Sequence, residues 1–502
     1  MNIKDSKMDQ KACEHAADIV AQMPRVMIAG AASGSGKTVI TCGLLCLLKD
    51  KGLSPVSFKC GPDYIDPMFH KKVLGIDSLN LDTFLAGEDG VRSLVYDKAA
   101  EGGHFAVIEG AMGIYDGISP GSVKGSCYEI AMLTDTPVIL VINAIGAGRT
   151  VISLIKGILA DDFGCLIRGI ILNQMSDAYY ERLLPVIKAE ISKDRPDVTF
   201  FGHIPKTDDI GINSRHLGLK LPGEIADINE KISRYAKIME QGCDFSRVVS
   251  LMNSAARMSE RSVKNPVKAG RRQNNTGHAQ PLTLAVARDE AFCFYYPQNL
   301  TFLKDLGMNI VYFSPLNDEA VPEGADALLL GGGYPELFLE KLSRNVSMLG
   351  SVRHAVRSGM PVIAECGGFM YLHDSITDKA GIEYDMAGVV KGTCRYAGHL
   401  VNFGYMMITG PNGSLGQRTF SGAAEHFTGM RGHEFHYYES SAAADDYQLC
   451  KPSTGKEYTG MILKDNCLFG WPHLYYPSKP DAIPAFLGHA AADDFLTKEM
   501  KS

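Results

Sequence analysis

Several features that would place this chain in a special class of protein are missing from its sequence. Its 502 residues include one tryptophan and twelve cysteines, which contain no CxxC pair. No apolar run approaches the ~18 residues of a membrane-spanning helix. The scattered cysteines argue against a zinc cluster or a disulfide framework. The net charge of −7 argues against a basic nucleic-acid-binding surface. We therefore expect a cytoplasmic protein with reduced thiols that binds neither nucleic acid nor membrane.

The residues that are present have the pattern of an α/β protein. Hydrophobic residues make up 45% and charged residues 21%, and 52 glycines suit many tight turns. Short runs that are apolar throughout alternate with longer amphipathic stretches, which predicts a parallel sheet covered by helices on both faces. The first series of runs is Arg25–Ala29, Pro55–Lys59, Phe105–Glu109, Val138–Asn143, Gly169–Asn173 and Phe200–Ile204.

A second series of runs begins after a polar stretch and predicts a second α/β domain. Its members are Leu282–Ala287, Asn309–Phe313, Ala327–Leu330 and Pro361–Ala364, followed by segments typical of antiparallel strands at Gly404–Ile408, His433–Tyr438 and Cys467–Tyr476. We predict domains over residues 25–250 and 281–485, a polar extension over 1–24 without a secretory signal, and a tail over 486–502. Residues 251–280 read as a solvated linker, with a basic patch for an anionic substrate or partner as the alternative.

A glycine-rich loop follows the first apolar run and predicts a phosphate-binding site. The sequence GAASGSGKT, residues 30–38, leads into the apolar stretch Val39–Leu48, which indicates strand, loop and helix. Small residues let backbone N–H groups surround phosphate oxygens at the start of a helix. Lys37 would reach the β- and γ-phosphates, and Thr38 would offer its hydroxyl to Mg²⁺. Because Ala31 occupies the first glycine position of the strict motif, a glycine-rich turn without a ligand is the alternative.

Three acidic residues follow the next predicted strands. Asp63 and Asp66 lie in GPDYIDP, and Glu109 begins EGAMGIYDG. The carboxyl ends of parallel strands meet at one edge of a sheet, so these acids would lie beside the glycine-rich loop. Mg²⁺ typically takes one or two carboxylates together with phosphate oxygens. Each acid could instead cap a helix or sit in a solvated turn, a reading that is weaker for Glu109 because it ends a buried strand.

The second domain contains a candidate nucleophile. Cys366 follows a buried run and precedes Gly367, and a sharp turn from strand to helix there would expose its sulfur. The N–H of Gly367 could stabilise an oxyanion, and Gly332 or Gly333 in GGGYPEL could donate the other N–H group. A small buried cysteine is the structural alternative.

A cysteine nucleophile requires a base, and three histidines are candidates. They are His433 and His436 in GHEFHYYE and His473 in HLYYPSKP. A single histidine is more often structural than catalytic. The residues alone leave His436 and His473 equivalent.

Taken together, these segments resemble the glutamine-dependent amidases of tetrapyrrole synthesis, most closely the cobyrinic acid a,c-diamide synthase family. The resemblance covers about residues 25–480, and GPDYIDP together with EGAMGIYDG makes it specific. It implies a P-loop domain similar to dethiobiotin synthetases, followed by a class I glutamine amidotransferase domain. The motifs that carry it are GAASGSGKT, FKCGPDYIDPMFH, IEGAMGIYDG, INSRHLGL, GGGYPEL, ECGGFMYL, GHEFHYYE and HLYYPSKP.

The resemblance implies a carbon–nitrogen ligase of cobalamin biosynthesis. ATP, with Mg²⁺ as cofactor, would convert a side-chain carboxylate of cobyrinic acid or a related tetrapyrrole into an acyl phosphate. Cys366, with His473 as its base, would release ammonia from L-glutamine, and ammonia would displace the phosphate. Asp63, Asp66 and Glu109 match positions tied to metal and substrate activation. The residues that match the nucleotide site are Ser33, Gly34, Gly36, Lys37, Thr38 and, against adenine, Asn173.

Some alternatives stay open at this point. The same reaction on nickel sirohydrochlorin, in coenzyme F430 synthesis, fits the motifs equally well, and a homodimer is compatible with them. GPDYIDP argues against a cobyric acid synthase. Intact Cys366 and His473 argue against a P-loop ATPase or binding protein with an inactive amidotransferase domain. The sequence departs from the family where Asn143 replaces a frequent Asp, and Glu434 is only a candidate for the third member of a catalytic triad.

Overall fold

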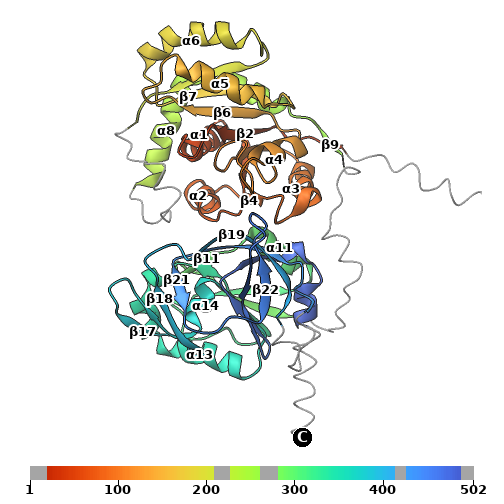
Figure 1. Ribbon diagram of the computed structural model, residues 1–502, viewed down its shortest axis with the longest axis vertical. Coiled ribbons are helices and arrows are strands. Elements are labelled where there is room, and N and C mark those ends of the chain that lie inside the picture. The colour runs from red at the N-terminus through yellow and green to blue at the C-terminus, as the bar shows by residue number, and fades with distance from the viewer. Residues whose placement is uncertain (1–19, 208–226, 260–280, 413–424, 488–502) are drawn as a thin grey trace, which may run out of the picture. The chain divides into compact units, whose positions relative to one another are not determined.

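The computed structural model describes residues 20–207, 227–259, 281–412 and 425–487 (Figure 1). The motif INSRHLGL and most of the predicted extension, linker and tail lie outside these residues. The chain divides into two compact units. Unit 1 comprises residues 1–83, 88–117 and 123–265, and unit 2 comprises residues 84–87, 118–122 and 266–502. Within the described ranges, no helix is both long enough and apolar enough to span a bilayer.

Unit 1 is built on a seven-stranded parallel sheet. Its spatial order is β4-β3-β5-β2-β6-β7-β8. All six runs of the first predicted series lie in this sheet, which confirms the predicted fold class. Only β4 had no predicted counterpart, because its sequence SLNL is short and half polar. The strands are β2 (Arg25–Gly30), β3 (Ser54–Cys60), β4 (Ser78–Leu81), β5 (His104–Glu109), β6 (Val138–Asn143), β7 (Ile167–Asn173) and β8 (Thr199–Ile204).

Helices cover the sheet of unit 1 (Figure 1). The first, α1, is buried over most of its length because it packs against β3 and β5 as well as against α8. A short antiparallel pair of strands, β1 (Val20–Ala21) and β9 (Met258–Ser259), joins segments near the two ends of the unit. The helices are α1 (Lys37–Asp50), α2 (Ile65–Leu74), α3 (Gly87–Glu101), α4 (Cys127–Leu133), α5 (Thr150–Ala160), α6 (Asp177–Ile191), α8 (Ile228–Gly242) and α9 (Phe245–Asn253).

Unit 2 combines a mostly parallel sheet with smaller sheets. The main sheet has the order β12-β10-β13-β15-β25-β24, in which only β24 is antiparallel. Its strands are β10 (Thr283–Ala287), β12 (Asn309–Phe313), β13 (Ala327–Leu330), β15 (Val362–Glu365), β24 (Ile462–Lys464) and β25 (Cys467–Gly470). The helices are α11 (Pro297–Asp305), η4 (Pro335–Leu337), α12 (Leu339–Arg344), α13 (Val346–Arg357), α14 (Gly367–Tyr371) and η6 (Tyr476–Ser478).

Three smaller sheets complete unit 2. A five-stranded sheet has the order β23-β22-β19-β20-β26, a four-stranded sheet has the order β17-β16-β18-β21, and β11 pairs with β14. Their strands are β11 (Phe292–Phe294), β14 (Gly332–Gly333), β16 (His373–Thr377), β17 (Glu383–Asp385), β18 (Val390–Tyr396), β19 (Asn402–Pro411), β20 (Arg431–His436), β21 (Tyr438–Ser440), β22 (Tyr447–Cys450), β23 (Glu457–Gly460) and β26 (His473–Tyr475).

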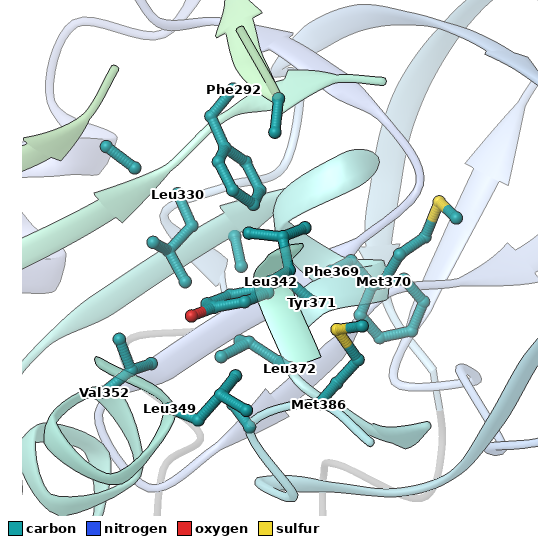
Figure 2. Packing of buried hydrophobic residues seen from close by; sticks show 14 of the residues in the cluster. Phe292, Leu330, Leu342, Leu349, Val352, Phe369, Met370, Tyr371, Leu372 and Met386 are labelled. Carbon is teal, nitrogen blue, oxygen red and sulfur yellow. The ribbon is translucent and has the colours of Figure 1, made fainter. Parts of the chain in front are cut away.

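Alternation along the parallel strands of unit 2 explains its two apolar cores. Successive side chains of a strand point to opposite faces of the sheet. Leu328 and Leu330 of β13 belong to one core, whereas Ala327 and Leu329 belong to the other. Figure 2 shows the first core, in which Leu330 lies among aromatic and aliphatic side chains that include Phe292 and Tyr371. Burial on both faces is what the continuous apolar runs predicted.

Two predicted single strands are each divided in the structure. The segment Cys467–Tyr476 forms β25 in the main sheet and β26 in the five-stranded sheet. Between them lies Pro472, which has no backbone N–H for a sheet ladder and favours a bend. The segment His433–Tyr438 likewise divides between β20 and β21. The consequence of the first division is that His473 begins a strand of its own.

Candidate active sites

The predicted phosphate loop lies between β2 and α1 at the carboxyl edge of the sheet of unit 1. Gly36 has φ +95°, and a Cβ atom there would lie 2.1 Å from Nδ2 of Asn173, so only glycine fits. The Asn173 amide donates to the carbonyl oxygen of Ser35 at 2.9 Å. Ser33 and Gly34 are exposed at the loop. The structure therefore gathers the predicted nucleotide residues here and adds a contact from the end of β7 to the loop.

The side chain of Lys37, which was predicted to bind nucleotide phosphates, contacts backbone carbonyl oxygens in the structure. Its Nζ donates to the carbonyl oxygen of Met112 at 2.5 Å and to that of Ala32 at 3.1 Å. Burial and the nearby charge of Lys59 lower the pKa of Lys37. Phosphate oxygens of a nucleotide would replace these carbonyl oxygens as partners and would restore the stability of the charged form.

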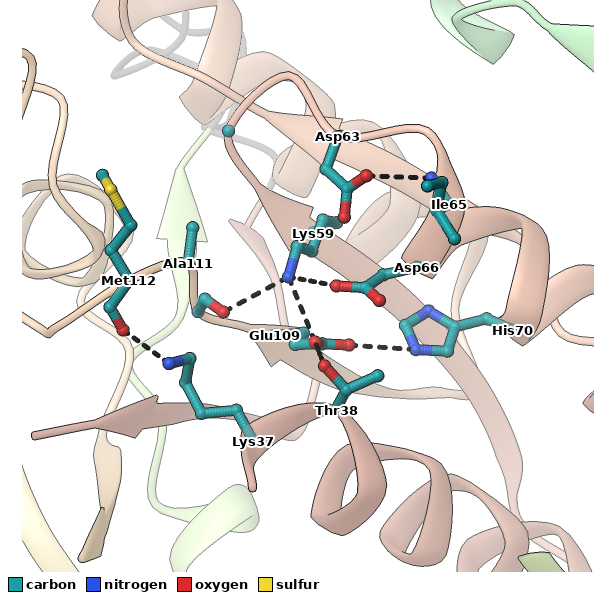
Figure 3. Close-up of polar contacts among 12 residues, drawn as sticks. Lys37, Thr38, Lys59, Asp63, Ile65, Asp66, His70, Glu109, Ala111 and Met112 are labelled. Atoms are coloured by element: carbon teal, nitrogen blue, oxygen red, sulfur yellow. Dashed lines mark hydrogen bonds and ion pairs between the residues drawn. The ribbon is translucent and has the colours of Figure 1, made fainter. Parts of the chain in front are cut away.

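The predicted acids meet around a lysine that the sequence analysis did not single out (Figure 3). Lys59 of β3 is adjacent in register to Glu109 of β5, so both side chains leave the same face of the sheet. Lys59 Nζ lies 2.5 Å from Asp66 Oδ2 and 3.1 Å from Glu109 Oε1. The Thr38 hydroxyl donates to the same Glu109 oxygen at 2.5 Å. The phosphate loop and the acids therefore form one site.

Charge in this buried cluster is unevenly distributed. Burial raises the pKa of Glu109, but the positive charge of Lys59 and the contact with His70 outweigh it and hold that pKa well below its usual range. Burial and the charge of Glu109 raise the pKa of Asp66. The two acids likewise raise the pKa of Lys59 against the effect of its burial. Glu109 is thus the carboxyl that stays ionised.

The donors of this cluster suit a magnesium ion bound together with a nucleotide. Asp66 Oδ1 is buried and has no hydrogen-bond partner, and the Thr38 hydroxyl and the Glu109 carboxylate lie nearby. Hard oxygen donors of this kind, in small number, are what Mg²⁺ takes when phosphates complete its shell. In the described part of the chain, no group of three or more His, Cys, Asp or Glu side chains is arranged to hold a metal unaided.

Asp63 lies near enough to this cluster to interact with the charges of Lys59 and Asp66, and it also has a local contact. Its Oδ1 accepts the backbone N–H of Ile65 at 2.9 Å, so it forms the turn that leads into α2. Asp63 therefore forms a turn, one of the alternatives that the sequence left open, and its role toward metal or substrate stays a prediction.

Cys366 stands at the sharp turn predicted for a nucleophile, but it is buried and not exposed as predicted. It follows β15, has φ +46° and ψ −102°, and is followed at once by α14. A non-glycine residue in this region is strained and persists only where its surroundings hold it. Its N–H donates to the carbonyl oxygen of Gly470 at 2.8 Å, which ties the turn to the end of β25. Burial, followed by nearby acids, raises the pKa of its thiol, so the thiolate needs a base.

The glycines predicted to form an oxyanion site lie beside this turn. A Cβ atom on Gly367 would come within 3.1 Å of the backbone nitrogen of Gly333, so these two glycines are adjacent. A Cβ atom on Gly332 would lie 2.2 Å from Cε1 of His473. The structure therefore packs the imidazole of His473 directly against the segment of Gly332 and Gly333, which in turn adjoins Gly367.

The other two histidines have different surroundings. His433 pairs in register with His473 across β20 and β26, and their rings stack with centroids 5.2 Å apart. His436 stacks on Trp471 at 4.1 Å, and its Nδ1 lies 2.7 Å from the carbonyl oxygen of Tyr438. Burial, followed by the neighbouring histidines, lowers the pKa of His473 well below its usual value. A neutral imidazole is the form that accepts a proton.

Glu434 does not lie with His473. It follows His433 directly on β20, so its side chain leaves the opposite face of that strand. Its carboxylate accepts hydrogen bonds from Asn402 and from the hydroxyl of Tyr458. The candidate third member of a triad is therefore placed away from the imidazole by the alternation of the strand.

Another buried carboxyl, missed by the sequence analysis, connects the two catalytic strands. Glu365 ends β15, immediately before Cys366, and accepts a hydrogen bond from the hydroxyl of Tyr476 at 2.9 Å. Burial raises its pKa to about 8, against the effect of hydrogen bonds from Tyr476 and the backbone of Leu474. The only sequence signal was an acid at the end of an otherwise apolar run.

Comparisons with known proteins match both units. Residues 26–217 match the family described as "CobQ/CobB/MinD/ParA nucleotide binding domain", and residues 283–479 match "CobB/CobQ-like glutamine amidotransferase domain". The chain is 35% identical over 474 residues to a protein of Caldanaerobacter subterraneus subsp. tengcongensis named "Cobyrinate a,c-diamide synthase", which covers 93% of this chain and 98% of that protein. The chain belongs to the cobyrinate a,c-diamide synthase family.

Further relatives agree with this placement. Proteins of the same name from Priestia megaterium and Fusobacterium nucleatum are each 34% identical to the chain. The first match covers 91% of this chain and 95% of its relative, and the second covers 90% and 98%. The predicted resemblance is thus confirmed. Membership in the family makes the chain a glutamine-dependent carbon–nitrogen ligase with a nucleotide-binding part and an amidotransferase part.

Proposed function

We propose that the protein amidates the a and c acetate side chains of cobyrinic acid, using ATP and glutamine, in cobalamin biosynthesis. The observation that carries the proposal is that one chain contains both an ATP-type site around Lys37 and a cysteine–histidine site around Cys366. The names of its relatives support cobyrinate as the substrate. A carboxylate is a poor electrophile and ammonium is no nucleophile, so forming an amide requires both activations.

The ATP site would activate the carboxylate. An acetate oxygen attacks the γ-phosphorus of ATP, the bond to the β-phosphate oxygen breaks, and an acyl phosphate and ADP result. Lys37 leaves the carbonyl oxygens of Met112 and Ala32 and stabilises charge on the phosphoryl group. Thr38, Glu109 and Asp66 would hold magnesium, which would neutralise phosphate charge when bound. Lys59 lies close enough to Asp66 and Glu109 to keep their charges balanced in a buried site.

The cysteine site would supply ammonia. His473, held neutral by burial, takes the proton of Cys366, and the thiolate attacks the side-chain carbonyl carbon of glutamine. The N–H groups of Gly367 and of Gly332 or Gly333 would stabilise the oxyanion. The carbon–nitrogen bond then breaks, His473 returns the proton to the leaving nitrogen, and water hydrolyses the thioester to glutamate. The ammonia displaces phosphate from the acyl phosphate, which leaves the amide.

The experiment that tests the substrate is incubation of the protein with MgATP, glutamine and either cobyrinic acid or nickel sirohydrochlorin, followed by mass spectrometry. We expect two carboxylates of cobyrinic acid to become amides. Conversion of the nickel macrocycle alone would move the protein to coenzyme F430 synthesis with the chemistry intact. Failure to hydrolyse glutamine would instead indicate an inactive amidotransferase unit.

A cysteine variant tests the separation of the two activations. Cys366→Ser should abolish glutamine-dependent amidation and retain amidation with ammonium chloride at high pH, because only ammonia release uses the thiol. Cys450→Ser, at the half-buried end of β22, is the matched control and should retain both activities. If Cys366→Ser loses the ammonia-dependent reaction while Cys450→Ser keeps it, the result would contradict the proposal that the two activations occur at separate sites.

A further inference from the structure

His70 of α2 is fully buried beside the acids of the candidate ATP site, and the family resemblance gives it no role. We propose that His70 is a positioning residue that holds one carboxylate oxygen of Glu109 and thereby aims the other oxygen at the nucleotide-bound magnesium ion. The proposal rests on the ATP half of the proposed function. It concerns how strongly magnesium contributes to nucleotide binding.

Local geometry places His70 on the cluster. Asp66 and His70 are separated by four residues on α2, so both lie on the helix face that covers β3. His70 Nε2 lies 3.1 Å from Glu109 Oε2 (Figure 3). Both side chains are fully buried, so no water competes for this contact. Both atoms are buried and neither has a hydrogen bond of good geometry, so the observed contact is the 3.1 Å approach itself. Because a buried carboxylate oxygen without a donor is costly, a proton on His70 Nε2 would relieve that cost.

Two serines orient the imidazole from its other side. His70 Nδ1 lies 2.9 Å from the Ser57 hydroxyl and 3.3 Å from that of Ser78. Ser57 lies two residues before Lys59 on β3, so it faces the same side of the sheet. A serine hydroxyl that donates to Nδ1 leaves the ring proton on Nε2, where it faces Glu109. Side chains from β3, β4 and β5 thus hold the ring, which α2 carries, in one orientation.

The two oxygens of Glu109 have separate partners. Oε1 receives the Thr38 hydroxyl and the ammonium group of Lys59, whereas Oε2 faces His70. A carboxylate held at one oxygen cannot rotate about its terminal bond, so the other oxygen stays directed at Thr38. Thr38 and Glu109 are two of the three residues that would hold magnesium. Partners of this outer kind typically change metal affinity by about 10–100-fold when they are removed.

Amide substitutions separate this role from simple packing. The side-chain nitrogen of glutamine reaches the position of a histidine Nε2, whereas that of asparagine reaches only the position of Nδ1. His70→Asn should therefore lose the contact with Glu109, and His70→Gln should restore it. His104→Asn, at the half-buried start of β5, is the matched control. A calorimetric unfolding transition of unit 1 at its wild-type temperature reports that this unit is folded in each variant.

The measurement is calorimetric titration of the full-length protein with the non-hydrolysable ATP analogue AMP-PNP, in EDTA and at increasing MgCl₂. We expect His70→Asn to bind the analogue normally in EDTA but to lose about 10–100-fold of the gain in affinity that magnesium gives the wild type. His70→Gln and His104→Asn should keep that gain. The apparent KM for magnesium in the amidation reaction should rise in His70→Asn more than kcat falls.

Three results would overturn the proposal. One is an unchanged magnesium gain in His70→Asn, and another is an equal loss of affinity with and without magnesium, which would indicate a structural role. If His70→Asn does not fold, the double variant Ser57→Ala, Ser78→Ala replaces it, because this variant keeps the ring but frees its orientation. The third overturning result is a double variant whose affinity for AMP-PNP gains as much from magnesium as that of the wild type. A wild type without any magnesium gain would instead overturn the ATP half of the proposed function, and this proposal with it.

Discussion

At the scale of single residues, the position of the imidazole in unit 2 depends on the absence of a side chain at Gly332. A Cβ atom there would lie 2.2 Å from Cε1 of His473, a separation that real Cβ atoms do not show. The contacting group is a ring held between β20 and the glycine-rich segment, so it cannot move aside without leaving the site.

This contact makes Gly332→Ala a sharp test of the glutaminase site. We expect the alanine to displace His473 and to lower glutamine hydrolysis by at least about 100-fold, within the range that positioned general bases contribute. Ammonia-dependent amidation should be unchanged. Gly350→Ala on α13 is the control, because nothing lies within 4 Å of its added methyl group. Normal glutaminase turnover in Gly332→Ala would contradict the placement of His473.

The buried carboxyl of Glu365 predicts a dependence of stability on pH. Its pKa rises from 4.5 to about 8 on folding, because burial disfavours the charged form. Between these values the folded state holds a proton that the unfolded state has lost, so this residue's contribution to stability is full below pH 4.5 and falls as pH rises to 8.

The substitution Glu365→Gln removes this proton and keeps an acceptor for Tyr476. We expect the free energy of unfolding of the variant, relative to wild type, to grow by about 1–3 kcal/mol between pH 5 and pH 8. Urea unfolding at a series of pH values measures it. A difference that is constant across this range would show that Glu365 is not protonated in the folded protein.

At the scale of elements, the short strand β26 is held on one side by a helix rather than by another strand. Asn299 of α11 donates to the carbonyl oxygen of Leu474 at 2.8 Å and accepts the N–H of Tyr476 at 2.9 Å. The opposite side of β26 pairs with β20. The asparagine amide thus replaces the backbone of a missing neighbour strand.

Removing that amide should loosen the strand that begins with His473. Asn299→Ala leaves two buried backbone groups without partners, so we expect a loss of about 2–4 kcal/mol in unfolding free energy, given ~1–2 kcal/mol for each group. Glutaminase kcat should fall while binding of AMP-PNP is unchanged. Asn253→Ala, on the exposed end of α9, is the control. If Asn299→Ala is destabilised but keeps its glutaminase kcat, the hydrogen bonds of Asn299 would contribute to stability and not to catalysis.

The end of β7 supports the phosphate loop in a comparable way. The sequence predicted that Asn173 contacts adenine, and that role stays a prediction. Its side-chain amide already donates a hydrogen bond to the carbonyl oxygen of Ser35 within the loop. We therefore expect Asn173→Ala to weaken binding of ATP and GTP equally, by about tenfold for one buried hydrogen bond. Equilibrium titration with both nucleotides measures this, and a loss confined to ATP would favour the adenine contact.

At the scale of the whole molecule, the two units each have their own sheet and buried apolar residues. We expect calorimetry to show two unfolding transitions. AMP-PNP with MgCl₂ at about 100 times its dissociation constant should stabilise unit 1 by about 2.7 kcal/mol and leave the other transition in place. Lys37→Met should lose this shift, and Cys366→Ser should keep it. A single transition that moves as a whole would contradict independent units.

Much of this organisation could be predicted from local patterns, and particular elements show why. Continuous apolar runs predicted six of the seven strands of the sheet in unit 1. The sequence analysis missed β4 because two of its four residues are polar. The loop around Lys37 and the turn at Cys366 have compact motifs. Lys59 and His70 lack such motifs. Each becomes notable only because β3, β5 and α2 converge on one buried carboxylate.

The sequence by itself determined most of the parallel strands, the α/β class, the family, the phosphate loop and the cysteine turn, because apolar run length and glycine spacing are local properties. Only the tertiary structure decided which side chains meet. A step of one residue along β20 turns a side chain to the opposite face, so His433 stacks on His473 while Glu434 points away. Such contacts depend on strand pairing and register, which no single segment specifies.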